Sequence, residues 1–201
     1  MKKILFQTAF ALIGFSIASS NANAQTTDIP VTASIKSEAV TSTQINWMTV
    51  EEAIAAAAKN PKKIMVDVYT KWCGPCKMMS QNTFTDPTFI EYMNANYYCV
   101  KFDAESAEPV QYKGQTYSNP DYDATKQGRN GVHQFARYLN VSAYPTLVFL
   151  DENGTYIGPV VGYKVAKDLE IFVKFFANND YKSVLTQEQW VTYQQNFKPT
   201  W

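Results

Sequence analysis

Short apolar runs recur along this 201-residue chain and are bounded by charged or turn-forming positions. The clearest is Lys63–Tyr69, which is apolar after its first residue except for Asp67, and it predicts a buried strand. Further strands are predicted at Tyr97–Asp103, Thr146–Leu150 and Tyr156–Val161.

Polar and apolar positions between these runs follow helical spacing. Thr49 and Glu52 form a capping-box pattern that opens a helix extending through Ala58. Asp86 followed by Pro87 supplies an N-cap and a first-position proline for another helix. Helices are also predicted at about Cys73–Thr83, Val132–Leu139, Val165–Ala177 and Thr186–Phe197.

The order of these elements indicates an α/β fold. Helical crossovers join the first two strands, which should therefore be parallel. The last two are joined by a short turn ending in Asn153-Gly154, a strong hairpin signal, and should be antiparallel. We therefore expect a mixed central sheet with helices on both faces.

The stretch 104–131 departs from this pattern, because it is long, polar and rich in Gly, Asn, Asp and Tyr. Such a long loop inside a compact domain is usually functional or mobile. Its residues Tyr112, Tyr117 and Tyr122 allow two interpretations. They form a surface that binds a partner, or they belong to a folded-back loop with no recognition role.

The N-terminus has the pattern of an export signal. Met1–Lys3 is positive, Ile4–Ala18 is apolar but short for a membrane span, and Ser19–Ala24 ends in a small-x-small pattern. We predict a signal peptide at 1–24, a linker or N-terminal arm at 25–45, a domain at 46–180 and a helical C-terminal extension at 181–201. An uncleaved membrane anchor is the alternative. Cleavage near Ala24 would give a periplasmic or secreted protein.

The charge and the cysteine content limit the classes of function that this chain could have. The formal net charge is zero and there is no basic stripe, which argues against nucleic-acid binding. The three cysteines are Cys73 and Cys76, two residues apart, and the solitary Cys99. An exported scaffold held by disulfides would normally carry a larger, even set. This use of cysteine favours redox chemistry. Separately, nothing in the sequence requires a dimer, and we therefore expect a monomer.

Cys73 falls at a strand-to-helix turn, where free N–H groups and the helix dipole stabilise a thiolate. Cys76 lies one turn further on and can close a disulfide with it. Zinc would need more ligands, and His133 is the single histidine, so we expect neither a metal nor a cofactor. Asp67 is either solvent-facing or a buried acid that exchanges a proton with Cys76.

The segment Val66–Lys77, with its Trp-Cys-Gly-Pro-Cys-Lys sequence, resembles the active-site segment of thioredoxins. Val141–Thr146 resembles the cis-proline loop of that superfamily, and Gly154 and Gly162 match its hairpin and following glycine. The resemblance covers about residues 50–177. Thr83–Pro87 further resembles exported thioredoxin-like proteins and the C-terminal domain of DsbD-type thiol reductases. The implied architecture is a thioredoxin fold with a long insertion before the helix that precedes the cis-proline loop.

The resemblance implies roles for individual residues. Cys73 and Cys76 would form the redox disulfide, with Asp67 as proton partner and Lys101 paired to it. The Tyr144–Pro145 bond would be cis and face the sulfur atoms. The residues implied to contact substrate are Trp72, Gly74, Pro75, Tyr144 and Pro145. Gly-Pro between the cysteines accompanies reducing thioredoxins, whereas strong oxidases carry a histidine there.

We therefore expect an exported thiol–disulfide oxidoreductase that reduces disulfides of protein substrates through Cys73 and Cys76. A membrane thiol-reductant conductor would recharge it. Two alternatives remain open at this stage. One is a disulfide oxidase or isomerase, and the other is a partner-binding module with a thioredoxin fold whose cysteines are incidental.

Overall fold

The computed structural model describes residues 42–201. The predicted signal peptide and residues 25–41 of the predicted linker lie outside the described residues. No helix within the described part of the chain has the length and apolar character needed to cross a membrane.

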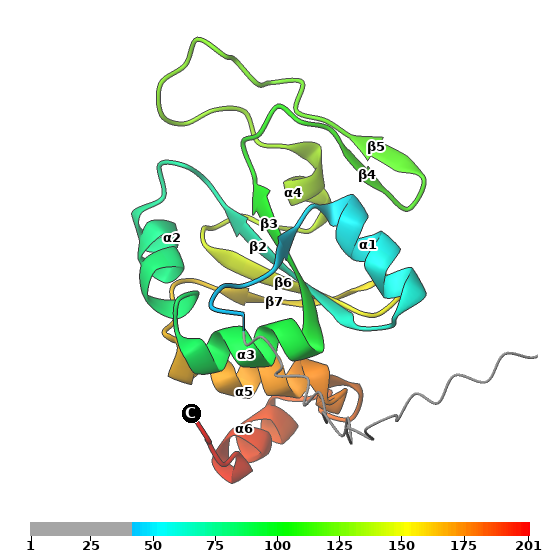
Figure 1. Cartoon of the computed structure of the whole chain (residues 1–201), viewed down its shortest axis with the longest axis vertical. Coiled ribbons are helices and arrows are strands. Elements are labelled where there is room, and N and C mark those ends of the chain that lie inside the picture. Colours follow the sequence, from blue (N-terminus) through cyan, green and yellow to red (C-terminus); the bar gives the residue numbers. More distant parts are fainter. Residues whose placement is uncertain (1–41) are drawn as a thin grey trace, which may run out of the picture. The chain divides into compact units, whose positions relative to one another are not determined.

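A five-stranded mixed sheet forms the centre of the domain (Figure 1). Its strand order is β1-β3-β2-β6-β7. The strands are β1 (Trp47–Met48), β2 (Lys63–Tyr69), β3 (Tyr97–Asp103), β6 (Thr146–Leu150) and β7 (Tyr156–Val161). The pair β2–β3 is parallel, whereas β6 is antiparallel to both β2 and β7. The predicted pairing directions are thus confirmed. Strand β1 was not predicted, because two residues carry no periodicity.

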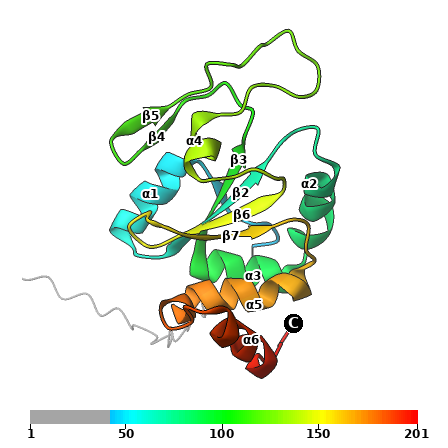
Figure 2. The same cartoon turned by 180° about the vertical axis from the view of Figure 1, so that it is seen from behind.

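Helices cover both faces of the sheet, as predicted (Figure 2). The helices of the domain are α1 (Val50–Lys59), α2 (Gly74–Met78), η1 (Met79–Thr83), α3 (Pro87–Asn96), α4 (Gln134–Tyr138), α5 (Ala166–Ala177), η2 (Asp180–Lys182) and α6 (Gln187–Asn196), of which α6 packs against the outer side of α5. One core joins α1 and α4 to the sheet, and the other joins α3 and α5 to its opposite face. Side chains alternate along β2, so Val66 and Val68 enter the first core while Met65 enters the second.

Local capping explains where several helices begin. The Thr49 hydroxyl accepts the Glu52 N–H, and the Glu52 carboxylate accepts the Thr49 N–H at 2.9 Å, which confirms the capping box. The Asp86 carboxylate accepts the Phe89 N–H at 2.9 Å at the start of α3. Each cap satisfies backbone donors that would otherwise lack partners at the helix end.

The helix predicted over 73–83 is present, but its second half is not α-helical. Helix α2 ends at Met78 and continues as a π-helical turn over Met79–Thr83. Tertiary contacts hold this wider turn, since the Thr83 hydroxyl donates to the Lys164 carbonyl at 2.6 Å. Insertions of this kind within helices are frequent at functional sites.

The insertion contains regular structure that the sequence did not predict. Strands β4 (Val110–Tyr112) and β5 (Gln115–Tyr117) form a hairpin, with positive φ at both turn residues, Lys113 and Gly114. Tyr112 is 2% exposed and its hydroxyl donates to the Gly154 carbonyl. The interpretation of the three tyrosines as one binding surface is therefore wrong for Tyr112, which belongs to the core.

Candidate active site

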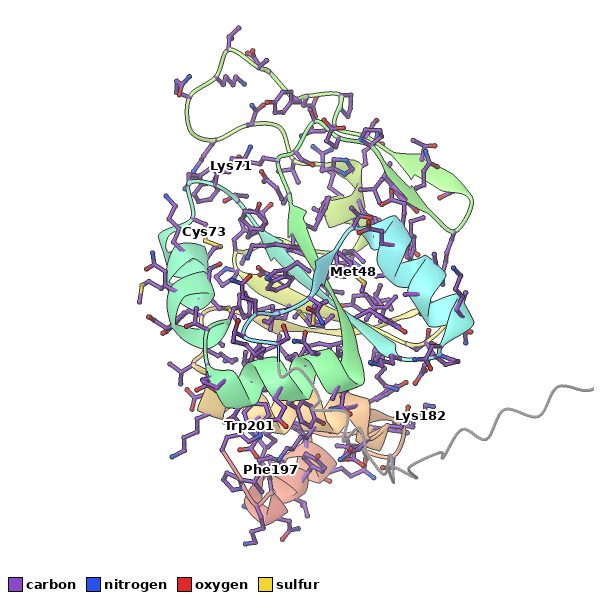
Figure 3. All side chains as sticks on the ribbon, in the orientation of Figure 1. Met48, Lys71, Cys73, Lys182, Phe197 and Trp201 are labelled. Atoms are coloured by element: carbon purple, nitrogen blue, oxygen red, sulfur yellow. A yellow bond between two sulfur atoms is a disulfide. The ribbon has the colours of Figure 1, made fainter. Side chains whose placement is uncertain are left out.

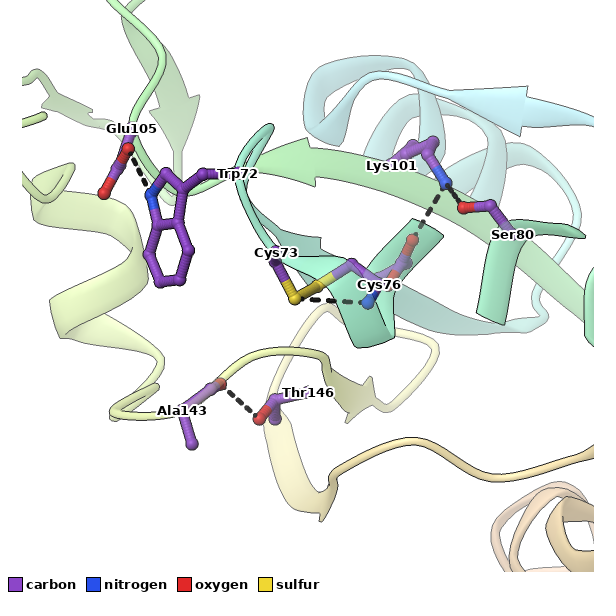
Figure 4. Close-up of a disulfide and its surroundings, with 9 residues drawn as sticks. Trp72, Cys73, Cys76, Ser80, Lys101, Glu105, Ala143 and Thr146 are labelled. Atoms are coloured by element: carbon purple, nitrogen blue, oxygen red, sulfur yellow. Dashed lines mark hydrogen bonds and ion pairs between the residues drawn. A yellow bond between two sulfur atoms is a disulfide. The ribbon is translucent and has the colours of Figure 1, made fainter. Parts of the chain in front are cut away.

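The two cysteines of the CxxC motif are joined by a disulfide at the start of α2 (Figure 4). Strand β2 ends at Tyr69, and Cys73 is the N-cap of α2, with a Cα–Cα distance of 5.3 Å to Cys76. The Cys76 N–H donates to Cys73 Sγ at 3.1 Å. A Cys73 thiolate formed on reduction would receive the same hydrogen bond and the field of the helix N-terminus, and both favour the anion.

An ion pair with a buried carboxylate lies on one side of the disulfide, which we call the Cys76 side (Asp67, Ser80 and Lys101). Asp67 and Lys101 are direct partners in the β2–β3 register, and their side chains meet at 3.0 Å. Lys101 Nζ also donates to Ser80 Oγ at 3.1 Å. Asp67 is 2% exposed, and burial raises the pKa of its carboxyl group while Lys101 opposes that rise.

Aromatic rings surround the Lys101 ammonium group. Its nitrogen lies 4.7 Å from the ring centre of Trp47, 5.0 Å from that of Tyr69 and 5.2 Å from that of Phe84. Cation–π attraction compensates part of the hydration that the ammonium group loses. The side chain of Asp67 is 3% exposed, whereas that of Lys101 is 29% exposed, so the carboxylate is the member of the pair that is shielded from solvent.

A hollow of about 310 Å³ lies between Lys101 and the redox centre. Cys76, Lys101 and Ser80 all line it, and so do the exposed Lys77 and Gln81 at the surface. The Cys76 sulfur and the Lys101 ammonium group therefore share one space that reaches the surface. This arrangement suits transfer of a proton to or from Cys76.

The opposite side of the disulfide, which we call the Trp72 side, consists of Trp72, Glu105 and Arg129. Trp72 Nε1 donates to Glu105 Oε2 at 2.9 Å (Figure 4). The Arg129 guanidinium carbon lies 4.2 Å from the Trp72 ring centre, in a cation–π contact. Trp72 also meets Tyr144 edge-to-face, with 6.0 Å between ring centres.

Glu105 and Arg129 were missed in the sequence. A signal for Glu105 exists, because β2 and β3 are parallel neighbours and the residues that follow them meet at one edge of the sheet. Trp72 follows β2 and Glu105 follows β3, so their proximity can be derived from the predicted topology. Arg129 carries no comparable signal, since it reaches Trp72 from the end of an irregular loop.

The loop Val141–Thr146 follows α4, and its Tyr144–Pro145 peptide bond is cis. The Gly162 N–H donates to the Pro145 carbonyl at 2.8 Å, and the Thr146 hydroxyl donates to the Ala143 carbonyl at 2.8 Å. Burial, followed by the charges of Glu105 and Asp103, raises the pKa of the Tyr144 hydroxyl. Gly74 and Pro75 are exposed on the surface of the same CxxC turn.

Two conspicuous residues lie away from this chemistry. Cys99 is 1% exposed in β3, and burial raises the pKa of its thiol. His133 is the N-cap of α4, with Nδ1 accepting the Phe135 N–H, and its Nε2 lies 3.0 Å from the Glu108 carbonyl. Across residues 42–201, no group of three or more His, Cys, Asp or Glu side chains is placed to hold a metal ion.

A mixed sheet that presents a CxxC disulfide at a helix N-terminus is the arrangement used by thiol–disulfide oxidoreductases. The chain belongs to the family of thioredoxin-like domains, whose model matches residues 50–177. At the level of the family, this is a thioredoxin-like thiol–disulfide oxidoreductase that resembles DsbD-type domains.

Individual relatives support this placement. The chain is 31% identical over 93 residues to the thiol:disulfide interchange protein DsbD of Haemophilus ducreyi, and the match covers 46% of this chain but 12% of that protein. It is 30% identical over 90 residues to a thioredoxin-like protein of Synechocystis, covering 41% of this chain and 80% of that protein. A thioredoxin-fold protein from Helicobacter pylori superimposes with a TM-score of 0.51 at 13% identity, covering 68% of this chain and 82% of that one.

Proposed function

We propose that this protein reduces disulfides in partner proteins by dithiol exchange through Cys73 and Cys76. The observation that carries the proposal is the Cys73–Cys76 disulfide at the start of α2, with a backbone N–H directed at Cys73 Sγ. A structural disulfide would not need this stabilisation of a thiolate, whereas an attacking cysteine does.

The reaction begins with the reduced dithiol. The Cys73 thiolate attacks one sulfur of the partner disulfide, so that the partner S–S bond breaks, a mixed disulfide forms and one partner thiolate leaves. Cys76 then loses its proton and attacks Cys73 Sγ, which releases the second partner thiolate. The two partner thiolates take up two protons. The partner gains two electrons, and Cys73 and Cys76 end as the disulfide.

Asp67 is the group proposed to accept the Cys76 proton. Its pKa is raised by burial, which brings it closer to the working pH, where a general base is most effective. Lys101 bonds to Asp67 and lines the same hollow as Cys76, so the proton that leaves Cys76 is proposed to pass through this hollow to Asp67. We assign Lys101 a supporting role, because it stabilises the ionised form of Asp67.

Trp72, Gly74, Pro75, Tyr144 and Pro145 are proposed to contact the partner. Gly74 and Pro75 are exposed on one side of the disulfide, and the cis-proline loop presents the exposed Ala143 and half-exposed Tyr144 on the other. An extended partner segment would lie between these surfaces and pair with backbone groups of the loop.

The direction of electron flow and the location are part of the proposal. Gly-Pro between the cysteines favours a reductase, and the relation to proteins named thiol:disulfide interchange protein DsbD favours recharging by a membrane thiol-reductant conductor. The export pattern of residues 1–24 favours a periplasmic or secreted protein. The protein would act as a monomer.

Insulin reduction with dithiothreitol as electron donor tests the activity. We expect turnover by the wild type and none by Cys73→Ser, and absence of turnover in both would favour a binding module. A reduction potential measured against glutathione tests the direction. We expect a value near that of thioredoxin, about −270 mV, whereas a value near about −120 mV would identify an oxidase.

A further inference from the structure

The C-terminal part of the insertion forms a loop, residues 118–131, that is held in place by its own hydrogen bonds. Asn119 Nδ2 donates to the Gly131 carbonyl at 2.7 Å and to the Ser106 carbonyl at 3.1 Å. Asp123 and Asn130 exchange two bonds of 2.8 Å, which close the end of the loop. The 118–131 loop is thus a pre-formed surface, which lowers the entropic cost of binding against it.

Gly131 makes this closure possible. A Cβ atom at this position would lie 2.5 Å from the Asp121 backbone, which is closer than non-bonded atoms approach. The two ends of the 118–131 loop can therefore meet only because residue 131 has no side chain.

The 118–131 loop lies beside the redox centre. A hollow of about 330 Å³ separates it from the CxxC turn, with Trp72 and Lys71 on one wall and Tyr122, Lys126 and Asn130 on the other. Figures 1 and 2 show the loop beyond the turn that joins β2 to α2. A hollow of this size accommodates side chains of a partner segment whose disulfide reaches Cys73.

The charges around this hollow are arranged by depth. The carboxylates Asp103 and Glu105 are at its floor, where Asp103 is 10% exposed and Glu105 is 9% exposed. Both already have partners, since Asp103 accepts the Glu105 N–H at 3.0 Å and forms an ion pair with Lys71 at 3.6 Å, and Glu105 accepts the Trp72 indole N–H. They have little capacity left for a ligand.

Cations form the exposed rim. The side chain of Lys71 is 83% exposed, and Lys126 and Arg129 of the 118–131 loop are exposed as well. Lys77, on the other side of the disulfide, is also exposed and lines the Cys76 hollow. The carboxylates of the 118–131 loop have partners of their own, since Asp121 pairs with Arg137 at 3.3 Å and Asp123 accepts the Thr125 N–H at 2.9 Å. An approaching partner therefore meets the cations Lys126 and Arg129 on one side of the disulfide and Lys77 on the other.

We propose that this cationic rim selects partner proteins whose target disulfide is flanked by acidic residues, and that the 118–131 loop is the specificity-determining element. The inference rests on the proposed reductase function and names the substrate class of the same site. Opposite charges steer a partner into place and raise the association rate, and salt screens the effect.

Three synthetic peptides test this specificity. Each contains one intramolecular disulfide, flanked by Glu, Ser or Lys, and is otherwise identical. The pre-reduced protein is mixed with each peptide, and the second-order rate of reduction is measured by chromatography after acid quenching. At low ionic strength we expect the Glu peptide to react about tenfold faster than the Lys peptide, at the lower end of known steering effects. The ratio should approach one in about 1 M salt, where the screening length is about 3 Å.

The variant Lys126→Glu/Arg129→Glu should lose or invert the ratio. Lys198→Glu controls for reversing a single charge away from the site and is compared with Lys126→Glu alone, because Lys198 is exposed and follows Phe197, which lies far from Lys71 in Figure 3. Equal rates for all three peptides with the wild type would overturn the acidic preference while the reductase function stands. If the double variant kept the wild-type ratio of Glu-peptide to Lys-peptide rates, the 118–131 loop would not be the element that determines specificity. Failure to reduce any peptide or insulin would overturn the proposed function itself.

Discussion

The two sides of the disulfide use the same three chemical groups in different ways. Each side has a carboxylate, a cation and an aromatic ring. On the Cys76 side, Asp67 and Lys101 bond directly at 3.0 Å beneath aromatic rings. On the Trp72 side, Glu105 and Arg129 each contact Trp72, which lies between them.

The two sides differ in how deeply their charged groups are buried. Asp67 is 2% exposed, and burial raises its pKa, so its protonation can change during the reaction. Arg129 is exposed and lies over the Trp72 ring. A buried carboxylate is therefore suited to proton transfer, whereas an exposed cation on an aromatic ring is suited to recognition. The predictions below test this division.

The largest effect is expected from Cys76→Ser. Without the second cysteine, the mixed disulfide between Cys73 and a partner cannot be resolved, so catalytic turnover should stop and covalent complexes should accumulate. Non-reducing electrophoresis and mass spectrometry of the trapped complexes would measure this. Cys99→Ser is the matched control, because Cys99 is buried outside the site. Continued turnover in Cys76→Ser would contradict the two-cysteine mechanism.

Asp67→Asn should separate activity from stability. We expect the rate of insulin reduction at pH 7 to fall by about 10- to 100-fold, because proton transfer by a positioned group contributes at least this much. Stability should rise instead. The folded-state pKa of Asp67 is raised above its ordinary value of 3.8, so its ionisation weakens the fold as pH increases through that range.

Thermal unfolding at several pH values measures the second effect. The variant should unfold about 2–4 °C higher than the wild type at neutral pH, as 1 kcal/mol would produce in a domain of this size. The difference should disappear below about pH 3, where Asp67 is protonated in both the folded and unfolded states. A neutral-pH decrease in stability would show that the ion pair with Lys101 outweighs the cost of burying the carboxylate.

The Cys76 side was more accessible to sequence analysis than the Trp72 side. Asp67 is conspicuous as a charge within an apolar strand, and Lys101 follows from a family pattern on the neighbouring strand. The insertion contains no comparable sequence signal for its strands or for Arg129. Strands β4 and β5 are too short to show a period, and the position of Arg129 depends on long-range closure of the 118–131 loop. Elements that depend on non-local contacts leave little trace in local sequence.

Tyr112→Ala tests whether the insertion is an integral part of the fold. Tyr112 packs against Phe135 and Tyr138, so its removal should cost about 3 kcal/mol of unfolding free energy. Denaturant titration measures this cost, and Tyr122→Ala, on an exposed residue, should change it by less than about 0.5 kcal/mol. If the alanine variant does not fold, Tyr112→Phe should still fold and lose about 1 kcal/mol with the bond to Gly154. Equal stability of the Tyr112 and Tyr122 variants would mean that the hairpin is not anchored by this contact.

The smallest effect is expected from Glu105→Gln, the same chemical change as Asp67→Asn on the other side of the disulfide. The amide oxygen can still accept the Trp72 N–H, but loss of the charge should weaken that bond and cost about 1 kcal/mol of stability. Reduction of a small uncharged disulfide should be unchanged, because Glu105 takes no part in proton transfer. Reduction of a disulfide peptide with acidic flanks should become about twofold faster, since one negative charge has left the floor of the hollow. Parallel rate measurements on the two variants decide whether the sides differ in function. If Glu105→Gln slowed the small disulfide as much as Asp67→Asn does, both carboxylates would act on the cysteines, and the division between proton transfer and recognition would be wrong.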